Sequence, residues 1–262
     1  SLRPNWSPAT TVPSVDTRRP RSRAAASKSP SSMHSRMAVL DTARFVDPAV
    51  AILPVDGAGL VDPAVAIPDG TGLVAVMQVN NEIGTIQPLE KWGAFAARQG
   101  ALLLVDAVQA YGKLALAEAD MIAVSAHKLH GPKGIGALWV RDGIALNPQQ
   151  TGGGQEAGLR SGTLSPALIA GFGAAAALAA TRMEEDAAHV EALWQLARDL
   201  FVDWTLNGSA EQRWHGNLNL RKEGLDVARL MSDCRKVMFS AGSACASGSG
   251  RPSHVLRAIG LT

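Results

Sequence analysis

The stretch MIAVSAHKLHGPKG, residues 121–134, predicts a buried strand that runs directly into a polar turn. Its first five residues form an apolar run of strand length, and glycine and proline follow soon after. Lys128 stands just beyond the expected strand, with Ser125 and His127 close to it in sequence. Polar groups that follow a buried strand are typical of ligand sites in open α/β sheets.

Lys128 is placed to act as a covalent catalyst. A lysine that forms a Schiff base must be partly desolvated and must lie near donors that hold its cofactor's phosphate. Ser125 and His127 can supply those donors. The pattern therefore indicates a lysine that binds pyridoxal phosphate (PLP). The alternative for the same residues is a solvated loop lysine beside glycines.

A second apolar run, LLLVDAVQ at residues 102–109, ends in a carboxylate and is followed by small residues that are expected to open a helix. Asp106 at the strand end can pair with the protonated pyridine nitrogen of PLP, which lets the ring act as an electron sink. Gln109 lies on the same helical face, and its amide can bind the ring's phenolic oxygen. The alternative is that Asp106 only caps the helix.

Two further segments carry polar groups or glycines in similar settings. The run VMQVNNEIGTIQP, residues 76–88, predicts another buried strand that enters a polar turn. The run GGGQEAGLRSGT, residues 152–163, is a glycine-rich loop that can cradle phosphate or serve as a flexible connection.

Strand-like runs near residues 50–55, 73–79, 101–106, 120–125 and 135–140 alternate with several helical stretches. This order predicts an α/β domain with a largely parallel sheet. The uncharged stretch 161–181 is mostly alanine and glycine, too weakly apolar for a membrane span, and it predicts a closely packed interior helix.

The composition is that of a globular protein, with 262 residues of which 47% are hydrophobic. Residues 1–36 contain seven Lys or Arg and one Asp, whereas the rest of the chain is mildly acidic and carries no nucleic-acid signature. Segment 1–36 is rich in proline, serine and arginine and is predicted to be disordered. An organelle transit peptide is disfavoured because prolines oppose an amphipathic helix and no initiating methionine is present.

Five phrases taken in order closely resemble the cysteine desulfurases, which are PLP-dependent enzymes of the class V aminotransferase superfamily. They are VNNEIGTIQP, VDAVQAYGK, SAHKLHGPKGIGAL, GGGQEAGLRSGTL, and SAGSACASG followed by SHVLRAIGL. The resemblance implies the aspartate-aminotransferase-like (type I) PLP fold. It implies a non-homologous or disordered segment 1–36, an incomplete PLP-binding large domain at 37–183, and an incomplete small domain at 184–262. A helix at 184–203 and a strand at 217–220 are expected to begin the small domain.

The resemblance also implies roles for individual residues. Lys128 and Cys245 are the implied catalytic pair: Lys128 holds PLP, and Cys245 attacks the sulfur of the cysteine substrate to leave alanine and an enzyme persulfide. Asp106 faces the pyridine nitrogen, and Thr163 reaches the phosphate of a partner subunit's cofactor. No metal site is expected. The full cofactor-binding set implied is Asn81, Asp106, Gln109, Ser125, His127, Lys128 and Thr163.

The sequence around Cys245 suits a persulfide carrier. The run SAGSACASGSG, residues 240–250, is small, polar and glycine-rich, which favours an exposed loop. Cys234 lies beside Leu230 and Met231 in an amphipathic stretch and is predicted to be a buried structural cysteine. Two cysteines in such different settings predict no disulfide framework, and nothing demands an oxidising compartment.

Several positions depart from the family's pattern. Arg36 stands where the ring-stacking histidine is expected, and His34 lies two residues earlier. Ala157 replaces a common arginine, and Arg257 is predicted to be a helix-surface arginine rather than the carboxylate-binding one. The resemblance also implies roughly a hundred further residues before Ala38 and a segment with the carboxylate-binding arginine after Thr262. We therefore expect a chain truncated at both ends, with sheet edges left uncovered.

The function predicted from this resemblance is desulfuration of L-cysteine, with sulfur passed to iron–sulfur cluster or thiolation acceptors. A homodimer in the cytoplasm is expected, with a sulfur-acceptor or scaffold protein as partner and no nucleic acid or membrane. Two alternatives stay open. One is a selenocysteine lyase or another class V enzyme, and the other is a non-catalytic remnant that binds a partner.

Overall fold

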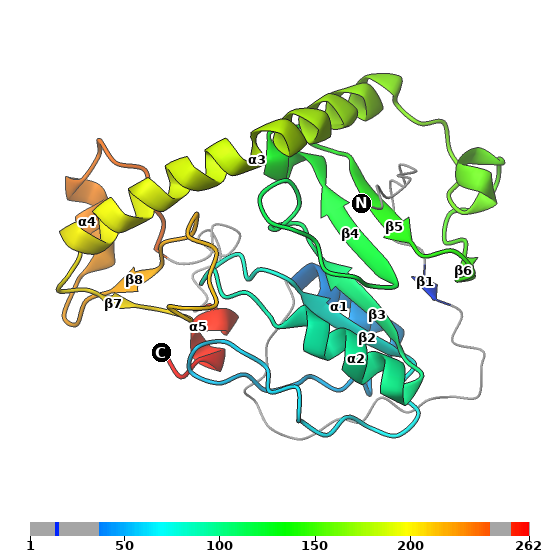
Figure 1. Cartoon of the computed structure of the whole chain (residues 1–262), viewed down its shortest axis with the longest axis horizontal. Helices are drawn as coiled ribbons and strands as arrows, with labels where there is room; N and C mark the ends of the chain where they lie inside the picture. The colour runs from blue at the N-terminus through cyan, green and yellow to red at the C-terminus, as the bar shows by residue number, and fades with distance from the viewer. Residues whose placement is uncertain (1–13, 16–36, 242–252, 262) are drawn as a thin grey trace.

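The computed structural model describes residues 14–15, 37–241 and 253–261, and its centre is a four-stranded sheet (Figure 1). Strands β2 (Leu73–Met77), β3 (Leu102–Asp106) and β4 (Met121–Ser125) are parallel, and β5 (Gly136–Val140) runs antiparallel to β4. The sheet order is β2-β3-β4-β5. The predicted α/β class with a mainly parallel sheet is confirmed.

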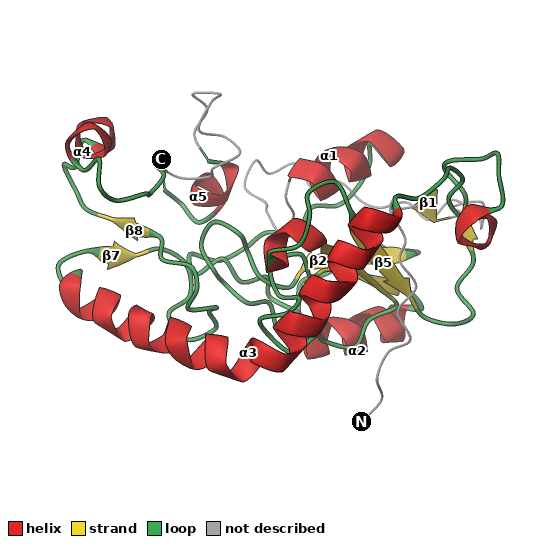
Figure 2. Cartoon of the chain, turned by 90° about the horizontal axis from the view of Figure 1, so that it is seen from above, coloured by secondary structure: helices red, strands yellow, loops and turns green. Residues whose placement is uncertain are grey.

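Helices α1 (Met37–Val46) and α2 (Leu89–Gln99) lie on opposite faces of this sheet (Figure 2). The residues of α2 that face the sheet include Trp92, which is fully buried, and Phe95. They pack on alternate strand residues such as Val76 and Val105, because side chains two apart in a strand share a face. Each such large apolar side chain stabilises the fold by about 1.5–3 kcal/mol when fully buried.

The strand register brings the carboxyl ends of β2, β3 and β4 into line. Met77 pairs with Asp106, and Asp106 pairs with Ala123. Asp106 therefore follows the core-facing Val105 and points to the opposite face of the sheet. The turns after these three strands therefore begin at the same end of the sheet, as expected for parallel strands.

Helix α3 (Pro166–Leu200) is 35 residues long and connects the sheet to the C-terminal part of the chain (Figure 1). Its N-terminus is formed by Ser165, whose hydroxyl accepts from Leu168 N, and by Pro166 in the first turn. The helix packs on the short 3-10 helix η1 (Ala126–Leu129). The predicted domain boundary at 183/184 falls inside this continuous helix, and the division into two domains stays a prediction.

The prediction that residues 161–181 form a closely packed interior helix is wrong for the described chain. Only Phe172 and Trp194 of α3 are buried, and 6% of the most apolar 18-residue stretch of the helix is buried. Alanine side chains are short, and the contacts of α3 with η1, Tyr111 and the C-terminal part leave most of its surface exposed. By length and composition this helix would suffice to cross a membrane, a test that helices of soluble proteins also pass.

The C-terminal part contains β7 (Thr205–Leu206), β8 (Leu220–Arg221), α4 (Val227–Asp233) and α5 (His254–Ala258). The strand predicted at 217–220 is wrong in extent, because pairing begins at Leu220. Asn217 and Asn219 instead use their side-chain amides to bind the carbonyl oxygen of Glu82 at 3.0 and 2.9 Å. These bonds hold residues 217–219 against a turn of the sheet domain.

The strand predicted near 50–55 is also wrong, and local hydrogen bonds give the reason. Residues 46–52 and 61–67 have the same sequence, VDPAVAI. In both copies the aspartate accepts from a backbone N–H two residues on, with Ala49 N to Asp47 Oδ1 at 2.9 Å and Ala64 N to Asp62 Oδ1 at 2.8 Å. An aspartate followed by proline favours such a turn over a strand.

Strand β1 (Ser14–Val15) pairs with β6 (Leu146–Asn147) in antiparallel fashion. The remainder of segment 1–36 lies outside the described residues, so its predicted disorder stays a prediction.

Candidate functional site

Asp106 is the last residue of β3 and is buried, with 9% of its surface exposed. Its Oδ1 accepts from Val108 N at 3.0 Å. The helix expected to open here is replaced by turns over residues 107–114, in which Tyr111 N donates to Ala107 O at 2.8 Å. Gln109 lies in these turns and is half-buried. Burial raises the pKa of the neighbouring Tyr111.

Lys128 lies in η1 directly after β4 and is half-buried. The Ser125 Oγ and His127 Nδ1 atoms are 2.8 Å apart, so a hydroxyl and an imidazole flank the lysine segment. His130 ends η1 in the left-handed conformation with a φ of 65°. These groups provide donors beside an amine that is partly removed from water.

Glycines let η1 sit close to its neighbours. A Cβ on Gly131 would lie 3.0 Å from Ala126 O and 3.2 Å from Ala175 Cβ of α3. A Cβ on Gly136 would lie 2.6 Å from Val124 O. The lysine segment therefore lies between α3 and the start of β5, in contacts that a residue larger than glycine at position 131 or 136 would prevent.

Asn81 lies in the turn that follows β2 and is half-buried. The buried Asn80 closes this turn through its Oδ1, which accepts from Glu82 N at 2.9 Å and Ile83 N at 3.1 Å. Gly84 continues the turn with a φ of 70°. The sequence predicted Asn81 but missed the turn-forming role of Asn80, although the polar run after an apolar strand was visible.

The structure therefore places Asn81, Asp106 and the segment Ser125–Lys128 after three adjacent, in-register parallel strands. Sequence separations of 19 or more residues between these positions are closed by the sheet. Ligands of open α/β folds bind at such strand ends.

Thr163 is exposed in the loop that precedes α3. This loop includes the 3-10 helix η2 (Gln155–Gly158), in which Glu156 and Ala157 adopt φ values of 51° and 53°. Few non-glycine residues adopt this left-handed conformation. Burial raises the pKa of Glu156, and the charge of Arg160 acts in the opposite direction. The proposed reach of Thr163 toward a partner subunit stays a prediction.

Cys245 lies in segment 242–252, which is outside the described residues. His34 and Arg36, in segment 16–36, are outside them too. Cys234 was predicted to be buried and is instead exposed at the end of α4. The reason is that α4 has no buried residue, so no other described element covers its apolar positions fully. Arg257 is exposed on α5, which agrees with the predicted surface arginine.

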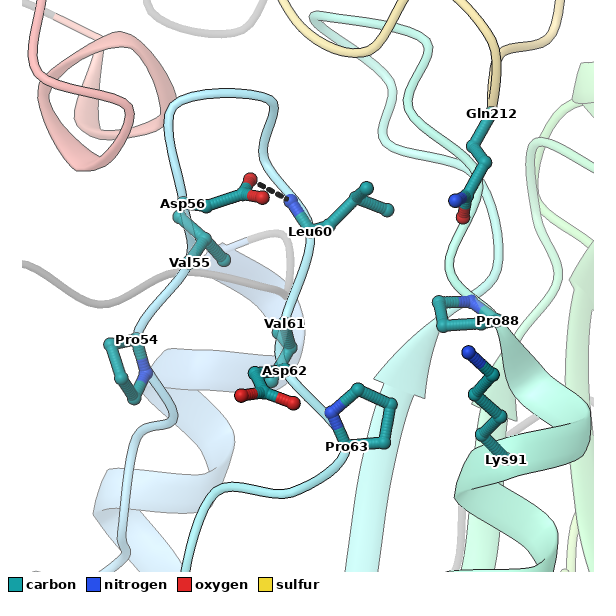
Figure 3. A pocket seen from close by; sticks show the side chains of 10 residues that line it. All are labelled: Pro54, Val55, Asp56, Leu60, Val61, Asp62, Pro63, Pro88, Lys91 and Gln212. Carbon is teal, nitrogen blue, oxygen red and sulfur yellow. Dashed lines mark hydrogen bonds between the residues drawn. The ribbon is translucent and has the colours of Figure 1, made fainter.

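A cavity of about 430 Å³ lies away from these residues (Figure 3). Asp56 in its wall already accepts from Ala58 N and Leu60 N, both at 2.9 Å, and so its carboxylate holds its own loop. The cavity contains none of the predicted site residues. Its lining is Pro54, Val55, Asp56, Leu60, Val61, Asp62, Pro63, Pro88, Lys91 and Gln212.

The residues at the strand ends fit PLP by the chemistry of their donors and acceptors. Asp106 offers a buried carboxylate for a protonated ring nitrogen, and Lys128 offers an amine. Ser125 and His127, at the end of β4, offer donors for a phosphate. Within residues 37–241 and 253–261 no group of three or more His, Cys, Asp or Glu side chains is placed to hold a metal ion.

Comparisons with known proteins agree with this arrangement. The sequence profile described as aminotransferase class-V matches residues 25–261, and the expectation that segment 1–36 is disordered or non-homologous stays a prediction. The mitochondrial cysteine desulfurase of Saccharomyces cerevisiae is 44% identical over 199 residues, which cover 72% of this chain and 40% of that protein. The cysteine desulfurase IscS of Shewanella amazonensis is 39% identical over 246 residues, which cover 86% of this chain and 59% of that protein.

Solved structures give the same result. A NifS-like protein superposes with a TM-score of 0.76 at 30% identity, covering 94% of this chain and 68% of that one. A structure described as SspA in complex with cysteine superposes with a TM-score of 0.72 at 33% identity, covering 88% and 68%. The predicted type I fold is confirmed by these superpositions. The chain spans about half the length of the curated relatives that it matches.

Proposed function

The chain belongs to the class-V aminotransferase family, and from that membership we propose that it carries the cofactor-binding and sulfur-transfer residues of a cysteine desulfurase. The proposed reaction converts L-cysteine and the thiol of Cys245 into L-alanine and a Cys245 persulfide. One carbon–sulfur bond breaks and one sulfur–sulfur bond forms, so no external oxidant or reductant is needed. The relatives from Saccharomyces cerevisiae and Shewanella amazonensis are named cysteine desulfurases, which supports this assignment.

The observation that carries the proposal is the alignment of three strand ends. Asp106, Asn81 and the Ser125–Lys128 segment follow β3, β2 and β4 in register. A carboxylate at one strand end and phosphate donors at the next suit a ligand with separate charged ends. PLP, when bound, supplies an electron sink for the bonds at the substrate's Cα and Cβ.

Each residue has a distinct proposed task. The Asp106 carboxylate holds a proton on the pyridine nitrogen, and Asn81 and Gln109 orient the ring through its phenolic oxygen. Ser125 and His127 bind the phosphate. Lys128 Nζ holds the cofactor and moves protons at the substrate carbon. The Cys245 thiolate attacks the substrate sulfur.

Absorbance spectroscopy tests this proposal directly. The purified chain is mixed with PLP and then with L-cysteine, and the visible band of lysine-bound PLP, alanine and persulfide are measured. Lys128→Ala is expected to abolish the band, whereas Cys245→Ser is expected to keep the band and lose the persulfide. If both variants behave like the parent, the assignment is wrong. Folded protein without any band would instead support the alternative of a non-catalytic remnant.

We also propose a homodimer that delivers sulfur to an iron–sulfur cluster or thiolation acceptor in the cytoplasm. Exposed Thr163, in a loop with left-handed Glu156 and Ala157, supports a partner subunit at that loop. The bacterial source of the IscS relative supports the cytoplasm, whereas the Saccharomyces cerevisiae relative is named as mitochondrial. Sedimentation with and without PLP tests the dimer, and a monomer under both conditions would contradict it.

A further inference from the structure

A group of buried polar side chains surrounds the turn after β2. The turn's backbone is tied to the C-terminal part at several points, since Glu82 O accepts from Asn217 Nδ2 and Asn219 Nδ2, and Trp214 N donates to Gly84 O at 3.0 Å. This turn is thus a fixed point shared by the sheet and the C-terminal part. The group consists of Asn80, Glu82, Thr85, Gln87, Asn207, Ser209 and Arg213.

The side chain of Glu82 leaves this group and reaches α5. It is 7% exposed, and its Oε2 accepts from Ser253 Oγ at 2.5 Å. Ser253 is the N-cap of α5, and its oxygen accepts from Val255 N at 3.1 Å and Leu256 N at 3.2 Å. A hydroxyl has one hydrogen to donate and two lone pairs, so Ser253 uses its full capacity in these three bonds.

Apolar contacts hold α5 on the same turn. Val255 is 2% exposed and packs with Ile83, which is fully buried. A Cβ on Gly59 would lie 2.5 Å from Ile83 Cδ1 and 3.7 Å from Ile259 Cγ2, so the adjacent loop closes over both residues. The short helix is therefore fixed by a buried hydrogen bond at its start and by apolar packing along one face.

Capping alone does not require Glu82. A serine N-cap satisfies the first N–H groups of a helix without any carboxylate behind it. Burying a carboxylate is costly unless it is well paired, so this contact is not the simplest way to stabilise a helix of five residues. The sequence suggests another purpose, because Glu82 follows Asn81 directly and Ser253 follows Cys245 by eight residues.

We propose that Glu82 is a positioning residue for sulfur transfer, and that its contact with Ser253 fixes the start of α5 relative to Asn81. The chain that leads from Cys245 to α5 then ends at a set distance from the cofactor site. The proposal rests on the proposed function. It assigns Glu82 no contact with substrate or cofactor.

Ser253→Asp separates anchoring from capping. Aspartate is as good an N-cap as serine, but it places a second carboxylate against Glu82 and removes the donor. Adding Glu82→Gln restores a donor, because the glutamine amide can bind the new aspartate. Glu82→Gln alone keeps an acceptor for Ser253 and is expected to have a small effect.

The first measurement is the single-turnover rate of persulfide formation at Cys245, in the PLP-loaded chain at saturating L-cysteine. Ser253→Asp is expected to slow it by about tenfold or more, because a hydrogen bond to a buried carboxylate is replaced by repulsion between two carboxylates. The double variant is expected to recover to within about threefold of Glu82→Gln. The band of lysine-bound PLP is expected to be unchanged in all three variants.

Asp226→Ala is the matched control, because it removes the N-cap of α4, whose Asp226 Oδ1 accepts from Arg229 N at 3.0 Å. Loss of this cap is expected to leave the persulfide rate unchanged. A Ser253→Asp rate equal to that of the parent, or a double variant as slow as Ser253→Asp, would overturn the proposal.

Amide hydrogen exchange provides a readout that does not depend on activity. Ser253→Asp is expected to speed exchange at Leu256 and Ile259 while leaving Val105 unchanged, and the double variant is expected to restore protection. Equal protection in the parent and Ser253→Asp would overturn the anchor. If the parent forms no persulfide while this exchange pattern is present, the proposed function fails and the role in sulfur transfer fails with it.

Discussion

His215 stacks on Trp194, with ring centroids 4.5 Å apart and planes 7° from parallel. His215 Nδ1 also lies 2.5 Å from Glu191 Oε2, so a hydrogen bond and a stacked ring join the turn at residues 213–217 to α3. The guanidinium carbon of Arg213 lies 5.2 Å from the Trp194 ring centroid. Trp194 is thus the centre of the contact between the long helix and the C-terminal part.

Trp194→Ala is expected to destabilise the chain by about 3–5 kcal/mol, because it removes a buried ring together with its contacts to His215 and to the Arg213 guanidinium. Urea unfolding measures the change. Leu196→Ala on the same helix is the control, since Leu196 is 56% exposed and its loss is expected to change stability by about 0.5 kcal/mol or less. Equal effects of the two substitutions would contradict a central role for Trp194.

The hydrogen bond from His215 is the main cause that holds the pKa of Glu191 below its ordinary value, and Gln195 adds to the effect. A carboxylate with a lowered folded-state pKa contributes stability above the ordinary glutamate pKa and loses it as pH falls through the lowered value. His215→Ala is therefore expected to raise the pKa of Glu191. Carbon-detected NMR titration measures it, with Gln195→Ala expected to give a smaller rise.

Asp120→Asn is expected to cost about 1–3 kcal/mol of stability. Asp120 Oδ2 accepts from Leu103 N at 2.7 Å, and Oδ1 accepts from Arg141 Nε and Nη2 at 2.8 and 2.6 Å. An amide at this position turns one acceptor into a donor that faces another donor. Arg141→Ala is the comparison and is expected to cost about 1 kcal/mol or less, because the arginine side chain is 57% exposed.

Gly136→Ala and Gly173→Ala are expected to change thermal stability in opposite directions. A Cβ on Gly136 meets the Val124 carbonyl oxygen at 2.6 Å, and this backbone clash is expected to cost about 1–3 kcal/mol. A Cβ on Gly173 in α3 meets nothing within 4 Å, so alanine there is expected to stabilise the helix by about 0.5–1 kcal/mol. Calorimetry distinguishes the two, and a loss of stability in Gly173→Ala would show a neighbour at that face.

Asp106→Asn keeps an oxygen that can accept from Val108 N but removes the negative charge. Under the proposed function it is expected to slow alanine formation by about 10²–10³-fold, the size typical of removing a preorganised electrostatic contact. The free energy of unfolding, measured with urea, is expected to change little. A rate equal to that of the parent would mean that Asp106 only closes the turn after β3.

The sheet was predictable because each strand is a short apolar run that ends in a polar group. β2, β3, β4 and β5 all lie where such runs predicted them. The candidate site was predictable for the same reason, since Asp106 ends β3 and Lys128 lies three residues after β4. The contacts of the C-terminal part were not predictable, because pairs such as Glu82 and Ser253 are 171 residues apart and neither has a local sequence signal.

The wrong predictions have local or packing causes. Residues 50–55 are apolar enough for a strand, but aspartate and proline nearby favour turns closed by side-chain bonds. Cys234 has an amphipathic setting, yet an amphipathic pattern predicts burial only where another element covers the apolar face. The alanine-rich start of α3 was predicted to be interior because it carries no charge, but small uncharged residues are buried only where another element covers them.

The two VDPAVAI copies form the same turn but differ in burial at their first residue. Val46 is 55% exposed, whereas Val61 is 3% exposed and its N–H donates to Gln87 Oε1 at 3.1 Å. Both valines precede the same six residues, so differences between them in mutational tolerance report their surroundings rather than the sequence that follows. A polar residue is expected to be acceptable at Val46 and damaging at Val61. The chain thus contains its own paired comparison of identical peptides in two environments.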